Sequence, residues 1–167
     1  MQLSTRSRYA VMAMVDLASR QAVGCECGPV CLAEIAASQQ LSLAYLEQLF
    51  ARLRRSGLVA SSRGPGGGYR LACDSDRISI AAIIAAVDEP MRTTRCDATS
   101  GPCLALPDRL IEPNRPGQQC QTHDLWAELG RQISLFLGGV TLADVVLGHV
   151  RGRAVAPTLG FTRVAAE

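Results

Sequence analysis

Several residue types and patterns are scarce or missing in this sequence. There is no lysine, so all seventeen basic residues are arginines, and only 4% of the 167 residues are aromatic. No apolar run approaches the roughly 20 residues that a transmembrane helix needs, which argues against a membrane-spanning chain. Residues 1–6 resemble neither a signal peptide nor a transit segment, so we expect a cytoplasmic protein with no membrane partner.

The signatures of common enzyme classes are also missing. No Ser/His/Asp arrangement and no pair of carboxylates suited to acid–base catalysis can be picked out of the sequence. The glycine-rich residues 63–69 lack the Gly-Lys-Ser/Thr ending of a phosphate-binding loop, and they do not open a helix as a dinucleotide-binding loop must. We therefore expect that the chain is not an enzyme.

The small net charge of +2 hides an uneven distribution of charge along the chain. Residues 1–70 hold eight arginines against four acidic residues, whereas residues 71–167 hold nine arginines against eleven acidic residues. The N-terminal part is therefore the one suited to a polyanionic partner such as DNA.

The order of the expected elements predicts a winged helix-turn-helix. Helical periodicity and capping residues predict four helices, at residues 5–19, about 32–36, 42–56 and 79–87. Between the last two, two short apolar runs flank the glycine-rich turn and predict a β-hairpin, at residues 58–62 and 69–72. We therefore predict a mainly α fold with a small β-hairpin wing, whose DNA-binding domain covers residues 1–88.

The third of these helices is the one expected to enter the major groove of DNA. Its apolar stripe leaves the other face outward, where Gln48 suits adenine and Glu47 suits the amino group of cytosine. Arg52 and its neighbours Arg54 and Arg55 suit phosphates, and Arg63 at the base of the glycine-rich turn suits a narrow minor groove. The alternative is that these arginines lie on a solvated helix face beside a loose turn.

The second half of the sequence changes character. Residues 89–121 hold five prolines and show no sustained period, so we expect an irregular loop with a function of its own. A helix is predicted over about residues 122–137 and a short one over 142–147, and residues 149–167 are expected to form a disordered tail. The long helix carries an apolar stripe that closes the core or, as we favour, packs against a second subunit in a homodimer, through Trp126, Leu129, Ile133 and Phe136.

Because seven is an odd number, the seven cysteines cannot all pair in intramolecular disulfides. Cys96, Cys103 and Cys120 lie in the irregular segment, and His123 follows the last of them in a Cys-x-x-His pattern. Three thiols and an imidazole suit zinc or an iron–sulfur cluster, and the spacing alone leaves the metal undecided. The alternative is a set of inert or transiently oxidised cysteines.

Specific segments of the sequence resemble the IscR family, which are winged-helix repressors that bind an iron–sulfur cluster and control cluster biogenesis in bacteria. The resemblance rests on residues 8–11 (RYAV), 41–50 (LSLAYLEQLF), 53–59 (LRRSGLV), 63–69 (RGPGGGY), 87–89 (VDE) and 120–126 (CQTHDLW). It implies a homodimer that binds a pseudo-palindromic DNA duplex. It also implies a [2Fe–2S] cluster, supplied by iron–sulfur assembly proteins and held by Cys96, Cys103, Cys120 and His123.

The resemblance also implies roles at the DNA. The family residue that matches Glu47 helps to choose between classes of operator, and those that match Tyr45, Gln48 and Arg63 lie at the DNA. The candidate DNA-binding residues are therefore Ser42, Tyr45, Glu47, Gln48, Arg52, Arg63, Gly64, Pro65 and Gly66.

The sequence departs from the family pattern at two places near these sites. Sixteen residues separate Cys103 from Cys120, whereas the family spaces its three cysteines closely. Ala44 stands where the family usually has a hydroxyl group, so a base contact is expected to be lost there.

The function expected from these observations is that of a repressor of iron–sulfur cluster biogenesis genes that senses cluster status. A related regulator of the same fold that senses nitric oxide, iron or oxidants is the nearest alternative, and His123 is the residue that separates the two. A small electron-transfer or cluster-carrier protein is the alternative from another class, although it would not need the helix and wing that suit DNA.

Four cysteines and one histidine lie outside this assignment. Cys25, Cys27 and Cys31 suit a second metal or a redox disulfide, but we favour exposed or half-buried thiols. Cys73 is expected to be a small packing residue, and His149 is expected to be exposed to solvent.

Overall fold

A computed structural model describes residues 4–22, 28–64, 66–87 and 123–150 of the chain. In the part that is described, the helices are α1 (Thr5–Ala22), α2 (Leu32–Gln39), α3 (Leu43–Arg55), α4 (Ile80–Val87), α5 (His123–Gly139) and α6 (Leu142–Val146). Strands β1 (Val59–Ser62) and β2 (Gly68–Leu71) form an antiparallel hairpin, and a short 3-10 turn, η1 (Ser75–Arg77), follows it. This architecture confirms the predicted mainly α fold with a small β-hairpin.

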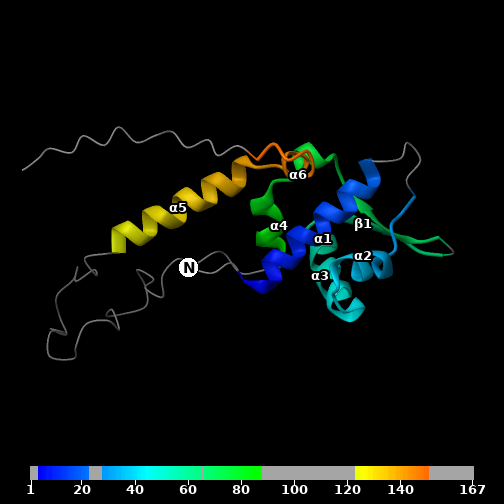
Figure 1. Ribbon diagram of the computed structural model, residues 1–167. Coiled ribbons are helices and arrows are strands. Elements are labelled where there is room, and N and C mark those ends of the chain that lie inside the picture. Colours follow the sequence, from blue (N-terminus) through cyan, green and yellow to red (C-terminus); the bar gives the residue numbers. More distant parts are fainter. Residues whose placement is uncertain (1–3, 23–27, 65, 88–122, 151–167) are drawn as a thin grey trace, which may run out of the picture.

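Helix α1 is the centre of the core. The side chain of Ser4 accepts a hydrogen bond of 3.1 Å from the backbone N–H of Ser7, which satisfies one of the donors that a helix start leaves open. About two turns of one face are fully buried, with Ala10, Ala13, Met14 and Leu17 against the rest of the core. The small alanines let other helices approach closely, and α1 packs against α2, α4 and α6 (Figure 1).

Helices α2 and α3 form a helix-turn-helix. The turn passes through Gln40, whose backbone is left-handed (φ 53°), and the N–H of Leu41 donates back to the carbonyl of Ala36 at 3.0 Å. Ser42 then caps α3 by accepting a hydrogen bond of 3.3 Å from the N–H of Tyr45. Gly57, with φ 72°, ends α3 as predicted for a left-handed glycine after a helix.

The hairpin is joined to the start of the helix-turn-helix by a further pair of residues. Val30 and Tyr69 exchange two backbone hydrogen bonds of 2.8 Å, so Val30 extends the hairpin on the outer edge of β2. Gly68 allows this approach, because a Cβ atom there would lie 2.3 Å from the carbonyl oxygen of Val30. The ring of Tyr69 packs edge-on against Phe50 of α3 at 4.9 Å between centroids, so the wing and α3 share one packing unit.

A second short pairing joins the C-terminal part to the winged region. The N–H of Ile80 donates to the carbonyl of Val140 at 2.9 Å, and the N–H of Leu142 donates to that of Ile78 at 2.8 Å. Leu142 is fully buried and seats α6 against α1. Helix α5 leaves this point and projects away from the other helices, with its C-terminal end beside α4 (Figure 1).

Three of the residues left over from the functional assignment are described, and all three lie at the surface. Cys31 and His149 are exposed, as expected, whereas Cys25 and Cys27 lie outside the described residues. The expectation that Cys73 is a small packing residue is wrong, because Cys73 is exposed. It lies in the connection between β2 and η1, and such connections run over the surface where their backbone polar groups meet water.

No helix in the described ranges has both the length and the apolar character required to cross a membrane.

An added methyl group at position 68 tests the close contact between the wing and Val30. Gly68→Ala would force β2 away from Val30, because its Cβ would meet the carbonyl oxygen at 2.3 Å. We expect the free energy of unfolding to fall by about 1–3 kcal/mol, the usual cost of overfilling a closed space. Urea unfolding followed by circular dichroism measures the change.

Gly28→Ala is the matched control, since nothing lies within 4 Å of a Cβ atom added there. It should change the free energy of unfolding by less than about 0.5 kcal/mol. Equal losses in the two variants would show that the Val30 contact is not the cause.

Candidate nucleic-acid interface

Helix α3 presents a polar face to solvent. Its side chains Leu46, Leu49, Phe50 and Leu53 are at most 1% exposed. This burial fixes the rotation of the helix, so that Ser42, Ala44, Glu47 and Gln48 are exposed on the other side. The two residues with groups suited to base edges, Glu47 and Gln48, therefore stand at the surface in the first half of α3, where a groove-binding helix places its reading residues.

Tyr45 is held differently from its polar neighbours on α3. It is half-buried, and its ring meets the ring of Tyr9 edge-on, with 6.0 Å between centroids and 87° between planes. Because Tyr9 belongs to α1, this pair fixes the first turn of α3 against the central helix. Tyr45 is thus a packing residue as well as a candidate DNA contact.

The three arginines in the last turns of α3 make three different contacts. Arg54 donates from Nη1 to the hydroxyl of Ser61 on β1 at 3.2 Å, and Arg55 donates from Nε to the carbonyl of Ala51 on its own helix at 3.3 Å. Arg52 donates from Nη1 to the carbonyl of Val87, the last residue of α4, at 2.9 Å. All three arginines are exposed, and their positive charges lie at the helix end that carries the negative partial charge.

The tip of the hairpin presents Arg63, Gly64 and Gly66 to solvent, and Pro65 lies outside the described residues. Gly64 (φ 110°) and Gly66 (φ 77°) adopt backbone conformations that residues with a side chain rarely adopt. The turn therefore needs glycine at these two positions, which carry no side chain that would block a groove.

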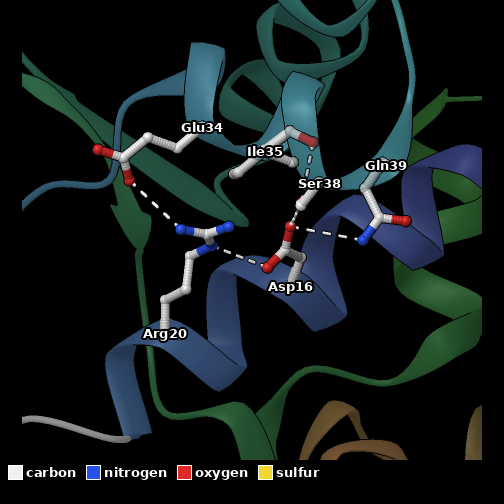
Figure 2. Close-up of polar contacts among 6 residues, drawn as sticks. All are labelled: Asp16, Arg20, Glu34, Ile35, Ser38 and Gln39. Atoms are coloured by element: carbon white, nitrogen blue, oxygen red, sulfur yellow. Dashed lines mark hydrogen bonds and ion pairs between the residues drawn. The ribbon is translucent and has the colours of Figure 1, made fainter.

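A polar network holds α2 against α1 on the side away from the core (Figure 2). The carboxylate of Asp16 accepts hydrogen bonds from Arg20 at 2.8 Å, from Gln39 at 3.4 Å and from the hydroxyl of Ser38. Arg20 also reaches Glu34 at 3.4 Å. Since Glu34, Ser38 and Gln39 all belong to α2, the network sets how the first helix of the helix-turn-helix sits on α1.

These contacts decide the ionisation of Asp16. Partial burial of this carboxyl raises its pKa, but the hydrogen bonds from Ser38, Arg20 and Gln39 and the charge of Arg20 outweigh burial. The pKa of Asp16 is therefore lowered from its ordinary value of 3.8. The network thus favours a charged carboxylate at neutral pH.

The expected metal ligands fall largely outside the structure. Cys96, Cys103 and Cys120 lie outside the described residues, and His123 is the first residue of α5, with its side chain outside the description. Within the described ranges, no three His, Cys, Asp or Glu side chains gather as a metal site would need. The structure therefore does not test the ligand set.

Helix α5 carries large apolar side chains at the surface. Trp126 is 42% exposed, Leu129 38% and Phe136 43%, while Ile133 is half-buried. Leu125 and Leu135 are more exposed still. On the polar side of α5, Arg131 and Gln132 donate to the carboxylate of Glu128 at 2.6–2.7 Å and hold its pKa at about 2. One side of the helix thus carries its own ion pair, and the other exposes large apolar side chains, although Leu137 near the C-terminal end packs against the core.

Comparison with known families decides what this arrangement is. The family profile named Rrf2, described as an iron-dependent transcriptional regulator, matches residues 3–147. The chain belongs to the Rrf2 family. The match spans both the helix-turn-helix and α5, so the fold described above is that of a family member over most of its length.

Individual relatives agree with the family assignment. The chain is 47% identical over 146 residues to the HTH-type transcriptional regulator IscR of Yersinia enterocolitica, covering 87% of this chain and 79% of the relative. It is equally similar to IscR of Serratia proteamaculans, with the same shares of each chain covered. Among solved structures, it matches IscR of T. potens at 32% identity and TM-score 0.66, covering 89% of this chain and 88% of that one. It matches CymR of B. subtilis, titled the global cysteine regulator, at 30% identity and TM-score 0.65, covering 89% and 98%.

These findings confirm the resemblance to IscR that the sequence segments indicated. This Rrf2 protein is a DNA-binding transcriptional regulator with a winged helix-turn-helix. Its relatives are regulators of transcription and not enzymes, which confirms the expectation drawn from the missing catalytic motifs.

Two contacts that hold α2 and α3 in place were not predicted from the sequence. The network around Asp16 had one signal, because Asp16 and Arg20 are four residues apart, a spacing at which opposite charges meet on a helix. The bond from Arg52 to Val87 had no signal, because its acceptor is a backbone carbonyl that every residue provides. Both contacts join elements that are distant in sequence.

Substitution of Asp16 tests the α1–α2 network in this Rrf2 protein. Asp16→Asn keeps the shape and removes the charge, so we expect the free energy of unfolding to fall by about 1–3 kcal/mol near pH 7. Because the folded pKa of Asp16 is lowered, its contribution is present above its ordinary pKa of 3.8 and is lost as the pH falls through the folded pKa. In urea unfolding at a series of pH values, the gap between the two proteins should therefore close in acid.

The control is Glu34→Gln, which removes an exposed charge at the edge of the same network. Exposed ion pairs contribute little, so its stability should stay close to that of the wild type at every pH. A gap between wild type and D16N that did not change with pH would contradict the role of the Asp16 charge.

Proposed function

We propose that this protein is a dimeric repressor of iron–sulfur cluster biogenesis genes that senses cluster status through a bound [2Fe–2S] cluster. The observation that carries the proposal is the 47% identity to regulators named IscR over 87% of the chain. The description of the Rrf2 family as iron-dependent supports it. The family match over residues 3–147 spans all four proposed cluster ligands.

The proposed DNA contacts use the surface of α3 and the wing. Glu47 and Gln48 read base edges in the major groove, with Ser42 and Tyr45 at the start of the same helix. Arg63 and the backbone of the turn, with Gly64, Pro65 and Gly66, lie in the minor groove. Arg52 stands at the far end of α3, where the helix meets α4. Exposure of Glu47, Gln48, Arg63, Gly64 and Gly66 supports this assignment.

The chemistry of the proposed ligands fits an iron–sulfur cluster. Cys96, Cys103 and Cys120 supply three thiolates and His123 an imidazole, which are the donor types found in [2Fe–2S] proteins. When bound, the cluster supplies a redox-active group whose presence depends on iron and on assembly proteins as donors. His123 is the first residue of α5, the proposed dimer helix, so ligand binding at this residue acts at the start of the helix on which the second subunit docks.

The proposed dimer interface is the apolar side of α5. Trp126, Leu129 and Phe136 are each more than a third exposed in the single chain, although large apolar side chains are usually buried. Ile133 lies between them in sequence and is half-buried. A partner α5 packed on this side would bury them and would place two α3 helices about one DNA turn apart on a pseudo-palindromic operator.

A second candidate function is favoured by one comparison. CymR of B. subtilis, titled the global cysteine regulator, matches with a TM-score close to that of IscR of T. potens. The same fold therefore also occurs in a regulator that is named for cysteine, and this is the second candidate function. Cysteine and histidine at positions 120 and 123 favour the cluster-binding alternative in this chain.

Loss of His123 tests the ligand set. Protein purified without oxygen should be coloured, with visible absorption and with iron and sulfide in equal amounts. His123→Ala should shift the absorption bands and lower the iron content. The control is His149→Ala, which changes the other histidine of the chain, exposed at the end of the described residues, and should leave the spectrum unchanged.

Two results would contradict this proposal in different ways. A colourless protein with stoichiometric zinc would remove the cluster assignment. If the protein is coloured and the spectrum of His123→Ala is unchanged, His123 is not a ligand of the cluster. That result would favour the related sensors of nitric oxide, iron or oxidants.

A charge on the apolar side of α5 tests the dimer. Leu129→Asp should weaken self-association by at least about a hundredfold, because an unpaired carboxylate buried at an interface costs several kcal/mol. Sedimentation velocity over a concentration series measures the monomer–dimer equilibrium. Leu147→Asp, at an exposed position beyond α6, is the control and should associate like the wild type. A monomeric wild type, or equal effects of both changes, would contradict the assignment of this face.

A further inference from the structure

Arg52 joins the recognition helix α3 to the end of α4. Its Nη1 atom donates a hydrogen bond of 2.9 Å to the carbonyl oxygen of Val87. Val87 is the last residue of α4 and is fully buried, and the carbonyl groups at the end of a helix have no partner within that helix. A guanidinium there supplies both a donor and a positive charge at the negative end of the helix dipole.

The neighbouring arginines make no such connection to α4. Arg55 lies one turn further along α3, and its Nε donates to the carbonyl of Ala51 within the same helix. Arg52 and Arg55 line one side of a shallow hollow at the junction of α3 and α4, together with Ser56 and Ala86. The two arginines therefore share charge, helix, exposure and surroundings, and differ in that the hydrogen bond of Arg52 leads to another helix.

We propose that Arg52 is a positioning residue, which orients α3 for base reading by bracing it on the Val87 carbonyl. The inference rests on the DNA-binding role of α3 in the proposed function and does not depend on the cluster. With α3 braced near its C-terminal end by Arg52 and at its first turn by the Tyr45–Tyr9 pair, the exposed Glu47 and Gln48 between them keep one orientation.

The position of Val87 gives this brace a further consequence. Val87 directly precedes residues 88–122, which contain Cys96, Cys103 and Cys120, three of the four proposed ligands. A change in backbone position at Val87 would therefore act on α3 through Arg52, in addition to the direct packing of α4 on α3.

Positioning and phosphate contact have different physical signatures. An arginine that neutralises a phosphate weakens binding to every sequence equally, and its loss lowers the slope of log affinity against log salt by about 0.9 for each contact. An arginine that only orients α3 leaves the salt slope unchanged. Its loss weakens binding to the preferred sequence more than to an unrelated one. A misplaced α3 cannot make its contacts with base edges, and only the preferred sequence offers those contacts.

The experiment compares Arg52→Gln with Arg55→Gln. The probes are a duplex enriched by the wild-type protein from a random-sequence library and a scrambled duplex of equal length and composition. Fluorescence anisotropy gives the affinity for each duplex over a range of salt concentrations. Circular dichroism and thermal unfolding show whether each variant is folded.

We expect Arg52→Gln to lower the ratio of affinities for the enriched and scrambled duplexes about tenfold, the size expected for one lost base contact, with the salt slope unchanged. Arg55→Gln should keep the ratio and lower the slope. The proposal is overturned if Arg52→Gln lowers the slope and keeps the ratio, or changes neither.

Two further outcomes separate a failure of the positioning role of Arg52 from a failure of the proposed DNA-binding role. If Arg52→Gln does not fold, Arg52→Lys takes its place. Lysine keeps the charge but reaches less far, and its single ammonium group is a less rigid donor than the guanidinium. A lower ratio of affinities for the enriched and scrambled duplexes therefore supports the positioning role, and an unchanged ratio overturns it. If the library yields no enriched duplex with the wild type, the proposed DNA-binding role itself is wrong, and the positioning role of Arg52 is wrong as well.

Discussion

Burial of one stripe of α3 is the constraint on which the rest of the site depends. Leu46, Leu49, Phe50 and Leu53 are spaced so that they share one side of the helix, and burying large apolar side chains contributes about 1.5–3 kcal/mol each. Rotation of α3 would expose them, so the helix has one orientation about its axis. The side that faces solvent is thereby decided, and it carries Glu47 and Gln48. The proposed recognition of bases is therefore a consequence of core packing on the opposite side of the same helix.

Short connections place the other functional elements around this helix. The Val30–Tyr69 pair holds the wing beside the helix-turn-helix, and the pairing of residues 78–80 with 140–142 sets the point from which α5 projects. Polar contacts at the surface supply the rest, with Asp16 holding α2 on α1 and Arg52 holding α3 on α4. The winged region is thus braced from several sides, whereas α5 exposes large apolar side chains, which are the proposed contact with a second subunit.

Local patterns in the sequence predict the elements well, because each pattern reflects a local cause. The helix expected at residues 42–56 is observed as Leu43–Arg55 with Ser42 as its cap, and the glycine-rich turn is a hairpin. Contacts between distant elements were not predictable, as Arg52 shows, because nothing in the sequence marks the carbonyl of Val87 as its acceptor. Cys73 was misjudged from its small size, although its place in a surface connection decides its exposure. The solvent-facing residues of α3 could be chosen from periodicity. The four candidate ligands could be picked out from their clustering, but the choice of a [2Fe–2S] cluster rests on resemblance alone.

The central claim is that two copies of this chain present their α3 helices together to one face of a DNA duplex. Hydroxyl-radical footprinting on a duplex enriched by the protein tests it most directly, since it maps contacts on both strands. The account predicts two protected regions related by two-fold symmetry, with centres about 10 base pairs apart, one helical turn. A single unsymmetrical protected region, or protection without a preferred position, would contradict it.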